Sequence, residues 1–208
     1  MSLMTNWGYT LTDASTLPQI LEPSEFDAYT AGKYDGDERT QPNIEAAESA
    51  IRNYCGWHVC PSLECEVNLT FYDKRVSIVG GGVLIQLPAT YVSAVESVTV
   101  GGMEVTGYIL EPNGVLRLYD INRCGYLKHT LITVRYTAGL PADLTGGIKE
   151  LIAHRVTHAL ASSGGIQSET AGGVSITYNA TWTNNARATA LADDNKEVLA
   201  PYKLRGVF

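Results

Sequence analysis

The chain has 208 residues and a formal net charge of −7, from 22 Asp and Glu against 15 Lys and Arg. Residues 1–50 hold nine acidic and two basic side chains, so this first quarter carries the whole excess and residues 51–208 are balanced. Phosphate neutralisation and adsorption to anionic lipid both need a cationic surface, so the composition argues against a nucleic-acid partner and against membrane binding. With 45% hydrophobic residues, the chain can bury a core, and its length predicts one main domain.

Neither a membrane span nor a signal peptide is expected. The longest uncharged stretch, Val76 to Val95, is broken by three glycines and Pro88 and is typical of two strands. The first 20 residues lack a basic start and a continuous apolar run, and the three residues before Met4 are interpreted as an expression remnant outside the fold. Without a secretion signal, the cysteines are expected to be free thiols.

The acidic N-terminal segment, 1–42, is predicted to contain one short helix that begins near Pro23, with Ser24 as its cap. The polar stretch from Gly32 to Pro42 is predicted to be a loop. A helix is then expected from Asn43 to Cys55, because apolar residues recur there at helical spacing. Asn43 is its predicted cap and Gly56 its predicted end.

From residue 63 to 137 the apolar period changes to two, which predicts short antiparallel strands. After a first strand at about 63–71, strands are expected at 76–79, 83–87, 95–100, 103–110, 115–119 and 129–137. Gly101-Gly102 and Pro112-Asn113-Gly114 are hairpin turn signals.

A second helix is expected over about Thr145 to Ser162, with an apolar stripe that includes Ile148, Ile152 and Val156. In the polar stretch 166–190, alternation at Val174, Ile176 and Tyr178 predicts a β arm. Asp193 or Asp194 then caps a short last helix that ends near Tyr202.

The predicted class is α+β, with helices flanking a small antiparallel β unit. Three segments are expected: 1–42, a core at 43–163 whose β unit covers about 63–137, and a β arm with C-terminal helix and tail at 164–208.

Two groups of residues were weighed as metal ligands. His154 and His158 lie four apart on a helix, but Arg155 stands where a metalloprotease has its Glu, so exposed histidines are favoured over a metal site. Cys55, Cys60 and Cys65 are each separated by four residues, with His58 between. That spacing does not match the paired ligands of structural zinc, and Cys55 on an apolar stripe indicates a buried thiol.

Catalytic motifs give no positive support for an enzyme or a cofactor. There is no phosphate-binding loop and no Gly-x-Ser-x-Gly elbow, and the glycines at 80–82 lie between two predicted strands, as in a hairpin turn.

Candidate interface residues come from the charge pattern. Arg155 falls within the apolar stripe of its helix, where it either extends its charged end past the stripe or forms an ion pair across a subunit interface. The tail is locally basic and either frays or docks on a neighbour. The candidate interface residues are Asp35, Asp37, Glu38, Arg155, Lys196, Tyr202, Lys203 and Arg205.

Four stretches, taken together and in order, resemble the head–tail connector proteins (adaptor or head-completion proteins) of long-tailed bacteriophages and prophages. They are the helix Ile44 to His58, Leu87-Pro88 with Val95 to Gly101, Val134 to Leu144 with its Tyr-Thr-Ala-Gly and Pro-Ala-Asp-Leu passages, and Val198 to Tyr202. The resemblance covers about residues 18–208. Some connectors are almost wholly helical, so their ring geometry transfers only loosely to a chain with a substantial β unit.

The resemblance implies a non-enzymatic virion protein without catalytic residues. Such proteins form a ring, commonly of twelve subunits, between the capsid portal and the stopper or tail, and extend the DNA channel at the virion neck after assembly in the host cytoplasm. The alternatives are a stopper or other tail-completion protein, a metal-dependent hydrolase built on the His or Cys residues, and a carbohydrate- or surface-binding β module.

Two hypotheses follow for assembly. In the first, residues 1–50 form an acidic face that meets a basic patch on a neighbouring subunit or partner. In the second, the polar arm at 164–190 and the tail at 196–208 become ordered on contact with the portal or a neighbour, because their composition cannot bury enough apolar surface alone.

Overall fold

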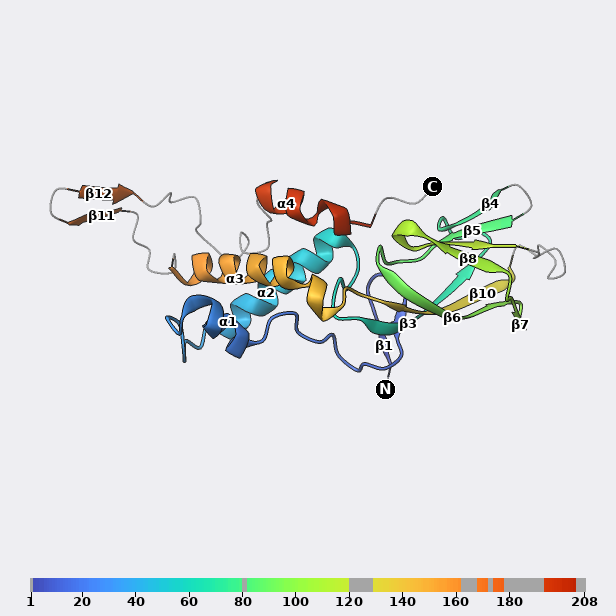
Figure 1. The fold of residues 1–208 in the computed structure, drawn as a ribbon, viewed down its shortest axis with the longest axis horizontal. Coiled ribbons are helices and arrows are strands. Elements are labelled where there is room, and N and C mark those ends of the chain that lie inside the picture. The colour runs from blue at the N-terminus through green and yellow to red at the C-terminus, as the bar shows by residue number, and fades with distance from the viewer. Residues whose placement is uncertain are drawn as a thin grey trace. The chain divides into compact units, whose positions relative to one another are not determined.

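The computed structural model describes residues 2–79, 82–119, 129–161, 168–171, 174–177 and 193–204, and the fold is α+β, as predicted (Figure 1). The chain divides into two compact units, each built from separate stretches of sequence. The β unit comprises Met1–Pro18, Tyr54–Leu144 and Leu199–Phe208. The helical unit comprises Gln19–Asn53 and Thr145–Val198.

Within its described residues, the β unit contains two antiparallel sheets. The first has the strand order β1-β2-β3-β10-β6-β7 and the second has the order β4-β5-β9-β8. The strands of the first sheet are β1 (Leu3–Met4), β2 (Thr10–Leu11), β3 (Leu63–Thr70), β6 (Val92–Val100), β7 (Met103–Glu104) and β10 (Leu131–Ala138). Those of the second are β4 (Val76–Val79), β5 (Gly82–Gln86), β8 (Tyr108–Glu111) and β9 (Val115–Leu118).

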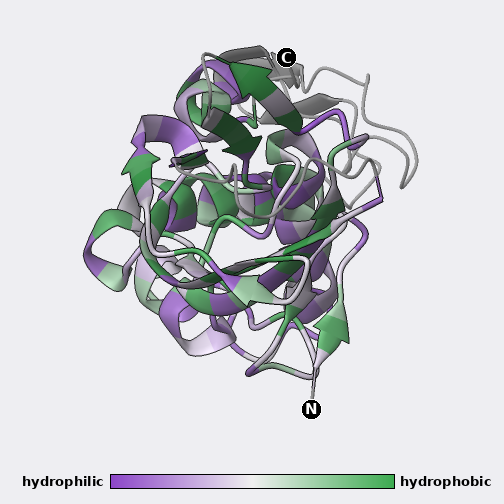
Figure 2. Ribbon diagram, turned by 90° about the vertical axis from the view of Figure 1, so that its right-hand side faces the viewer, coloured by the Kyte–Doolittle hydropathy of each residue, from purple (hydrophilic) through white to green (hydrophobic). Residues whose placement is uncertain are grey.

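Strict alternation along β3 and β10 builds the core of the β unit. Figure 2 shows hydrophobic and hydrophilic residues interspersed along the ribbon. Val67 pairs with Val134 and Cys65 with Tyr136, and all four side chains are buried. The intervening residues, such as Glu66 opposite Arg135, are polar. Because side chains alternate between the two faces of a strand, this register keeps one face apolar and the other wet.

Both predicted turns are confirmed as hairpins. Gly101 and Gly102 join β6 to β7 with φ of 60° and 80°, the positive values that a two-residue hairpin loop requires. Asn113 and Gly114 also have positive φ between β8 and β9, and a Cβ on Gly114 would lie 2.0 Å from the Ala89 carbonyl oxygen. β4 and β5 also pair antiparallel, as predicted for the strands around the third glycine cluster.

Two expectations about strands are wrong. The predicted strand 103–110 is β7 and β8, which belong to different sheets, because the chain leaves the first sheet after Val105 donates to the Val98 carbonyl. Leu3, one of the three residues interpreted as an expression remnant, forms β1 with Met4, and β1 pairs with β2, which in turn pairs with β3. These strands are only two residues long, so no periodicity marks them.

The helical unit contains α1 (Pro23–Thr30), most of α2 (Thr40–Cys55), α3 (Gly146–Ala161) and most of α4 (Asp193–Leu199), with a hairpin of β11 (Ser168–Ala171) and β12 (Val174–Thr177). Short 3-10 turns lie at Pro112–Gly114, Ala142–Leu144 and Ala200–Tyr202. The hairpin confirms the predicted β arm, although Tyr178 lies outside the described residues.

The helix starts differ from the predictions. Glu22, not Ser24, caps α1, through a reciprocal pair in which Glu22 and Glu25 accept each other's backbone amides. The second helix begins at Thr40, not at Asn43, whose side chain instead donates to the Arg39 carbonyl at 2.8 Å. Gly56 follows the end of α2 with φ of 80°, as expected for a helix stop.

A buried carboxylate organises the helical unit. Glu48 on α2 is 3% exposed, and its Oε1 accepts the backbone amides of Ile20 and Leu21 at 2.7 and 3.0 Å. Its Oε2 lies 3.7 Å from Arg52 Nη1. Burial raises the pKa of Glu48, and the two amides and Arg52 oppose that rise. Glu48 therefore ties the segment before α1 to α2.

Glu48→Ala should lower the free energy of unfolding by about 3 kcal/mol, because two buried amides lose their acceptor and Arg52 loses the carboxylate opposite it. Chemical denaturation followed by circular dichroism measures this. Glu45→Ala on the exposed face of the same helix is the matched control and should change stability by less than about 0.5 kcal/mol. Equal effects of the two substitutions would contradict the assigned role of Glu48.

Candidate interface surfaces

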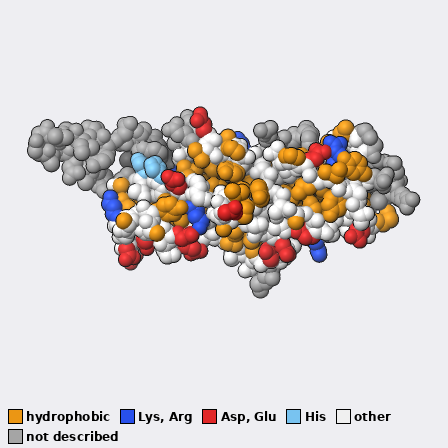
Figure 3. All heavy atoms as spheres, in the orientation of Figure 1, with side chains coloured by type: hydrophobic (Ala, Val, Ile, Leu, Met, Phe, Trp, Pro, Cys, Tyr) orange, Lys and Arg blue, Asp and Glu red, His pale blue; other side chains and the backbone are white. Residues whose placement is uncertain are grey.

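The acidic excess belongs to the helical unit. This unit contains 13 acidic and seven basic residues, whereas the β unit contains nine and eight, which gives net charges of −6 and −1. Figure 3 shows acidic side chains at the surface around α1 and the loop that follows it. The excess of acidic residues in the first quarter of the sequence therefore corresponds to a difference in net charge between the two folded units.

Among the three predicted acidic interface residues, Asp37 already has a partner within the chain. Arg39 donates from Nε to Oδ1 at 2.9 Å and from Nη2 to Oδ2 at 2.6 Å, and its backbone amide also donates to Oδ1. These bonds lower the pKa of Asp37 to about 2. The charge of Asp37 is thus largely balanced locally.

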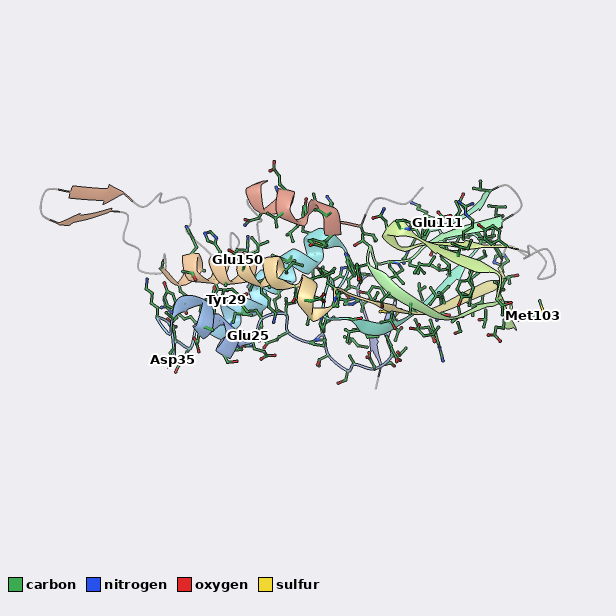
Figure 4. All side chains as sticks on the ribbon, in the orientation of Figure 1. Glu25, Tyr29, Asp35, Met103, Glu111 and Glu150 are labelled. Carbon is green, nitrogen blue, oxygen red and sulfur yellow. The ribbon has the colours of Figure 1, made fainter. Side chains whose placement is uncertain are left out.

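Asp35 and Glu38 remain as exposed carboxylates, with no ion pair among the described residues. Tyr29, near the end of α1, is 50% exposed. Figure 4 shows Tyr29 on α1 and Asp35 on the loop after it. We call Tyr29, Asp35 and Glu38 the acidic surface. It combines an aromatic side chain with two carboxylates, a combination that suits contact with a cationic protein surface.

The α3 candidates separate into buried and exposed faces, as the helical angle predicts. His154 and His158 are exposed, on the side opposite Ile152 and Val156. Arg155 is half-buried, and burial lowers the pKa of its guanidinium. Its charge is therefore not fully presented to solvent.

Three cysteines are buried free thiols, and for Cys55 this confirms the prediction made from its apolar position. Cys55, Cys60 and Cys65 are all free and buried, and burial raises the pKa of Cys55 and of Cys65 to about 12. A thiol is nucleophilic only as thiolate, so neither is activated for catalysis. Cys124 lies outside the described residues. In the part of the chain that the structure describes, no three His, Cys, Asp or Glu side chains gather as metal ligands would.

His58 has a structural role that its sequence position did not reveal. It is fully buried, with Nδ1 at 2.7 Å from the Tyr9 hydroxyl and Nε2 at 2.9 Å from the Ala138 carbonyl oxygen. A carbonyl only accepts, so Nε2 carries the hydrogen and the Tyr9 hydroxyl donates to Nδ1. Both ring nitrogens are engaged, which leaves none to hold a metal.

Two of the predicted C-terminal interface residues, Tyr202 and Lys203, lie on a segment that docks within its own chain. We call residues 199–204 the C-terminal strap. The Tyr202 carbonyl accepts from Trp57 Nε1 at 2.7 Å, and Lys203 Nζ lies 4.7 Å from the centre of the Tyr54 ring. The Leu204 amide donates to the Cys55 carbonyl at 2.8 Å. This part of the tail therefore has partners within its own chain, and the hypothesis that contact with another protein orders the tail stays a prediction.

The remaining candidates of the tail differ in position. Lys196 is half-buried on α4, whereas Arg205 and most of the polar arm at 164–190 lie outside the described residues. Sequence patterns did not identify Trp57, Tyr54 or Thr90 as partners of the tail. Their contacts join residues more than 100 positions apart, and no local pattern records such a separation.

The β unit also exposes large apolar side chains that sequence alternation alone did not identify. They are Met4, Tyr72, Ile78, Val79, Tyr91, Met103, Ile109, Tyr119, Leu131 and Leu144. Single exposed apolar residues are normal on soluble proteins, so these carry no assignment by themselves.

No family model and no curated protein matches the chain. No helix among the described residues has the length and apolar character needed to cross a membrane.

Arg39→Gln should raise the pKa of Asp37 from about 2 toward its ordinary value, because the two side-chain hydrogen bonds from Arg39 are the largest cause of the shift. The Arg39 backbone amide still donates to Oδ1, so part of the depression should persist. Titration of the Asp37 carboxyl carbon by NMR measures both values. An ordinary Asp37 pKa in the unsubstituted chain would contradict the local pairing.

Proposed function

We propose that this chain is a structural virion protein that forms a ring connector between the capsid portal and the tail of a long-tailed bacteriophage or prophage. It extends the DNA channel, completes the head, and acts without catalytic residues or cofactor. Its partners are further copies of itself, the portal protein, and a stopper or tail-completion protein. It works at the virion neck after assembly in the host cytoplasm.

The observation that carries this proposal is the ordered resemblance of four stretches to connector proteins. The first stretch falls on α2 with Gly56 to His58, and the second falls on the two residues after β5 and on β6 with Gly101. The third runs from β10 to the 3-10 turn before α3, and the last covers the end of α4 and the 3-10 turn after it. The most specific passage, Tyr136 to Leu144, spans the exit from β10 and the 3-10 turn before α3.

Close packing explains why the glycine in that passage is needed. Gly139 has φ of +121°, and a Cβ there would lie 2.1 Å from the Pro61 carbonyl oxygen. The following Leu140 donates its amide to the Val59 carbonyl at 2.8 Å. The backbone at Gly139 therefore passes so close to the backbone at Pro61 that a side chain there would clash.

Both the buried and the exposed side chains of the described residues are consistent with a structural role in an assembly. The buried thiols are not activated, and both nitrogens of His58 are engaged. The acidic surface on the helical unit and the nearly neutral β unit provide two different kinds of patch. A ring uses heterologous contacts, in which one patch of a subunit meets a different patch of the next.

The chain should bind the portal protein encoded beside it and form rings with it that negative-stain electron microscopy resolves. Pull-down with purified portal and, in parallel, with tail-tube protein measures this. Binding to the tail-tube protein alone would replace the adaptor role with a tail-completion role. Binding to neither, with no rings at any concentration, would contradict the proposed function.

Asp35→Asn combined with Glu38→Gln should weaken binding to the portal or to the neighbouring subunit about fivefold and reduce its salt dependence, because each exposed charge contributes about 0.2–1 kcal/mol. Titration at two salt concentrations measures both effects. Asp143→Asn, an exposed carboxylate on the β unit, is the matched control and should leave binding unchanged. Equal binding by all variants would reduce the acidic surface to a solubility feature.

A further inference from the structure

The second sheet of the β unit has an open strand at each edge. Its order is β4-β5-β9-β8, and in the part of the chain that the structure describes neither β4 nor β8 has a second strand beside it. Figure 1 shows β4 at the margin of the β unit. The backbone amides and carbonyls on the outer side of an edge strand can pair with a strand of another chain. Each edge is therefore a candidate contact surface.

The edges of the first sheet are protected against such pairing, whereas those of the second are not. β1 and β7 are only two residues long, and β7 includes Glu104. Short edge strands and charged side chains are features that block edge-to-edge pairing. β4 and β8 have four residues each, and apart from Glu111 at the end of β8 neither contains a charge or a proline.

The apolar face of the second sheet extends as far as both edges. Four fully buried side chains form its centre: Val83, Ile85, Leu116 and Leu118. Because cross-strand partners share a face, two rows continue outward from this centre, to Val76 and Ile78 on β4 and to Tyr108 and Leu110 on β8. Ile78, at the end of one row, is 56% exposed. Each row thus ends at an edge where a further strand could cover it.

The outward backbone groups belong to the same residues as the ends of these rows. The Arg75 carbonyl accepts the amide of the last residue of β5 at 2.8 Å, and the Gly107 carbonyl accepts the amide of the residue after β9 at 2.7 Å. Residues of an antiparallel strand alternate between bonding to the partner strand and facing away from it. Counted from these bonds, Ile78 directs its amide and carbonyl away from β5, and Leu110 directs its own away from β9.

The even number of strands makes the two edges complementary. All neighbouring strands of the sheet are antiparallel, so β4 and β8 run in opposite directions. A rotation about an axis parallel to the strands therefore brings β8 of a second copy beside β4 in antiparallel orientation, with both apolar rows on the same face of the joined sheet. Such a rotation is the operation that relates neighbouring subunits of a ring.

Charges at the strand ends agree with the antiparallel direction. Lys74 is exposed just before β4, and Glu111 at the end of β8 is half-buried beside Arg117. Antiparallel pairing places the start of β4 beside the end of β8 of the second copy, which brings Lys74 near Glu111. Parallel pairing would place these two charges at opposite ends of the contact.

We propose that β4 of one copy pairs antiparallel with β8 of a second copy, so that the second sheets of neighbouring subunits join edge to edge. This inference rests on the proposed function, which requires contacts between copies. The two edges are different surfaces, so repeated pairing generates a ring or a filament and not a closed pair. Pairing covers Ile78 with an apolar side chain of the second copy and supplies hydrogen-bond partners to the outward backbone groups of both strands.

A disulfide designed across the two edges tests the pairing. The two registers that match the apolar rows set Ile109 opposite either Ser77 or Val79 of the neighbouring copy. Residues opposed in this way have Cα atoms about 4.5 Å apart, a separation that a disulfide spans. One full-length chain carries Ile109→Cys and the other carries Ser77→Cys or Val79→Cys, all with Cys124→Ser. The two chains are mixed, oxidised and separated without reductant.

Head-to-tail pairing predicts a covalent dimer in one of the two mixtures, and a covalent ladder when one chain carries both substitutions of that pair. The control replaces the cysteine on β4 with Met103→Cys, which lies at an edge of the first sheet and is 48% exposed, as Val79 is. This control should give no dimer above background. Dimers of one variant with itself, in place of mixed dimers, would show two-fold pairing and overturn the proposal.

The outcomes separate the pairing from the proposed function. Absence of a mixed dimer, while the unsubstituted chain forms rings, overturns the pairing and leaves the proposed function intact. A mixed dimer without rings supports the pairing and counts against the proposed function.

A second variant tests the pairing without cysteines. Ile78→Lys should weaken self-association at least about tenfold, because an unpaired ammonium group is costly to bury between paired strands. Met103→Lys is the matched control and should leave association unchanged. Both positions are exposed, so circular dichroism should show a folded chain in each case, and analytical ultracentrifugation measures association. Equal association by the two variants overturns the pairing.

Discussion

The β unit depends on how the polar groups between Tyr54 and Pro61 are satisfied. In this stretch a helix ends and the chain turns into β3, so several backbone and side-chain groups are buried without local partners. Segments distant in sequence supply those partners. The N-terminal hairpin contributes the Tyr9 hydroxyl, β10 contributes the Ala138 carbonyl, and the strap contributes the Leu204 amide.

This convergence explains why the β unit is assembled from three separate pieces of sequence. Buried polar groups without partners cost more free energy than exposed ones, so removing any piece would leave a donor or acceptor in the core unsatisfied. Gly139 belongs to the same constraint, because only a residue without Cβ lets the chain pass the Pro61 carbonyl. The passage that carries the family resemblance is thus also a packing requirement of this junction.

In the helical unit, charged side chains hold the segments together. Glu48 is buried and holds the segment before α1, while Lys149 of α3 and Glu25 of α1 pair at 2.5 Å. The charges in these contacts are buried or paired, so they contribute little to the electrostatic potential at the surface. The carboxylates that remain exposed and unpaired, including Asp35 and Glu38, are the ones that a partner protein can contact. Net charge therefore overstates the available acidic surface, and the count of exposed, locally unbalanced carboxylates is the better measure.

Sequence patterns predicted the elements that are governed by local physics. Alternation located β3 and β10, paired glycines located the β6–β7 turn, and Gly56 marked the end of α2. Sequence patterns failed where contacts between residues distant in the chain determine which strand forms and which sheet it joins. The run 103–110 looks like one strand, yet its two halves join different sheets. Likewise, the two-residue strand β2 forms because the edge of β3 pairs with it, and β1 pairs in turn with β2.

The candidate interface residues show the same limit. Asp37 stood out in the sequence as an acid in an acidic run, and Arg39 two residues away could have indicated its pairing. Lys203 stood out as a basic tail residue, but its partner Tyr54 lies at the end of a helix formed much earlier in the chain. The sequence identifies which side chains are charged, and only the fold determines whether a charge already has a partner within the chain.

Taken together, the junction and the charge distribution constrain how copies of this chain could associate. The strap accepts from the Trp57 indole and donates to the Cys55 carbonyl at the end of α2, so an assembly that displaced the strap without replacing it would leave both groups without these partners. Binding energy from a new partner would first have to offset that loss.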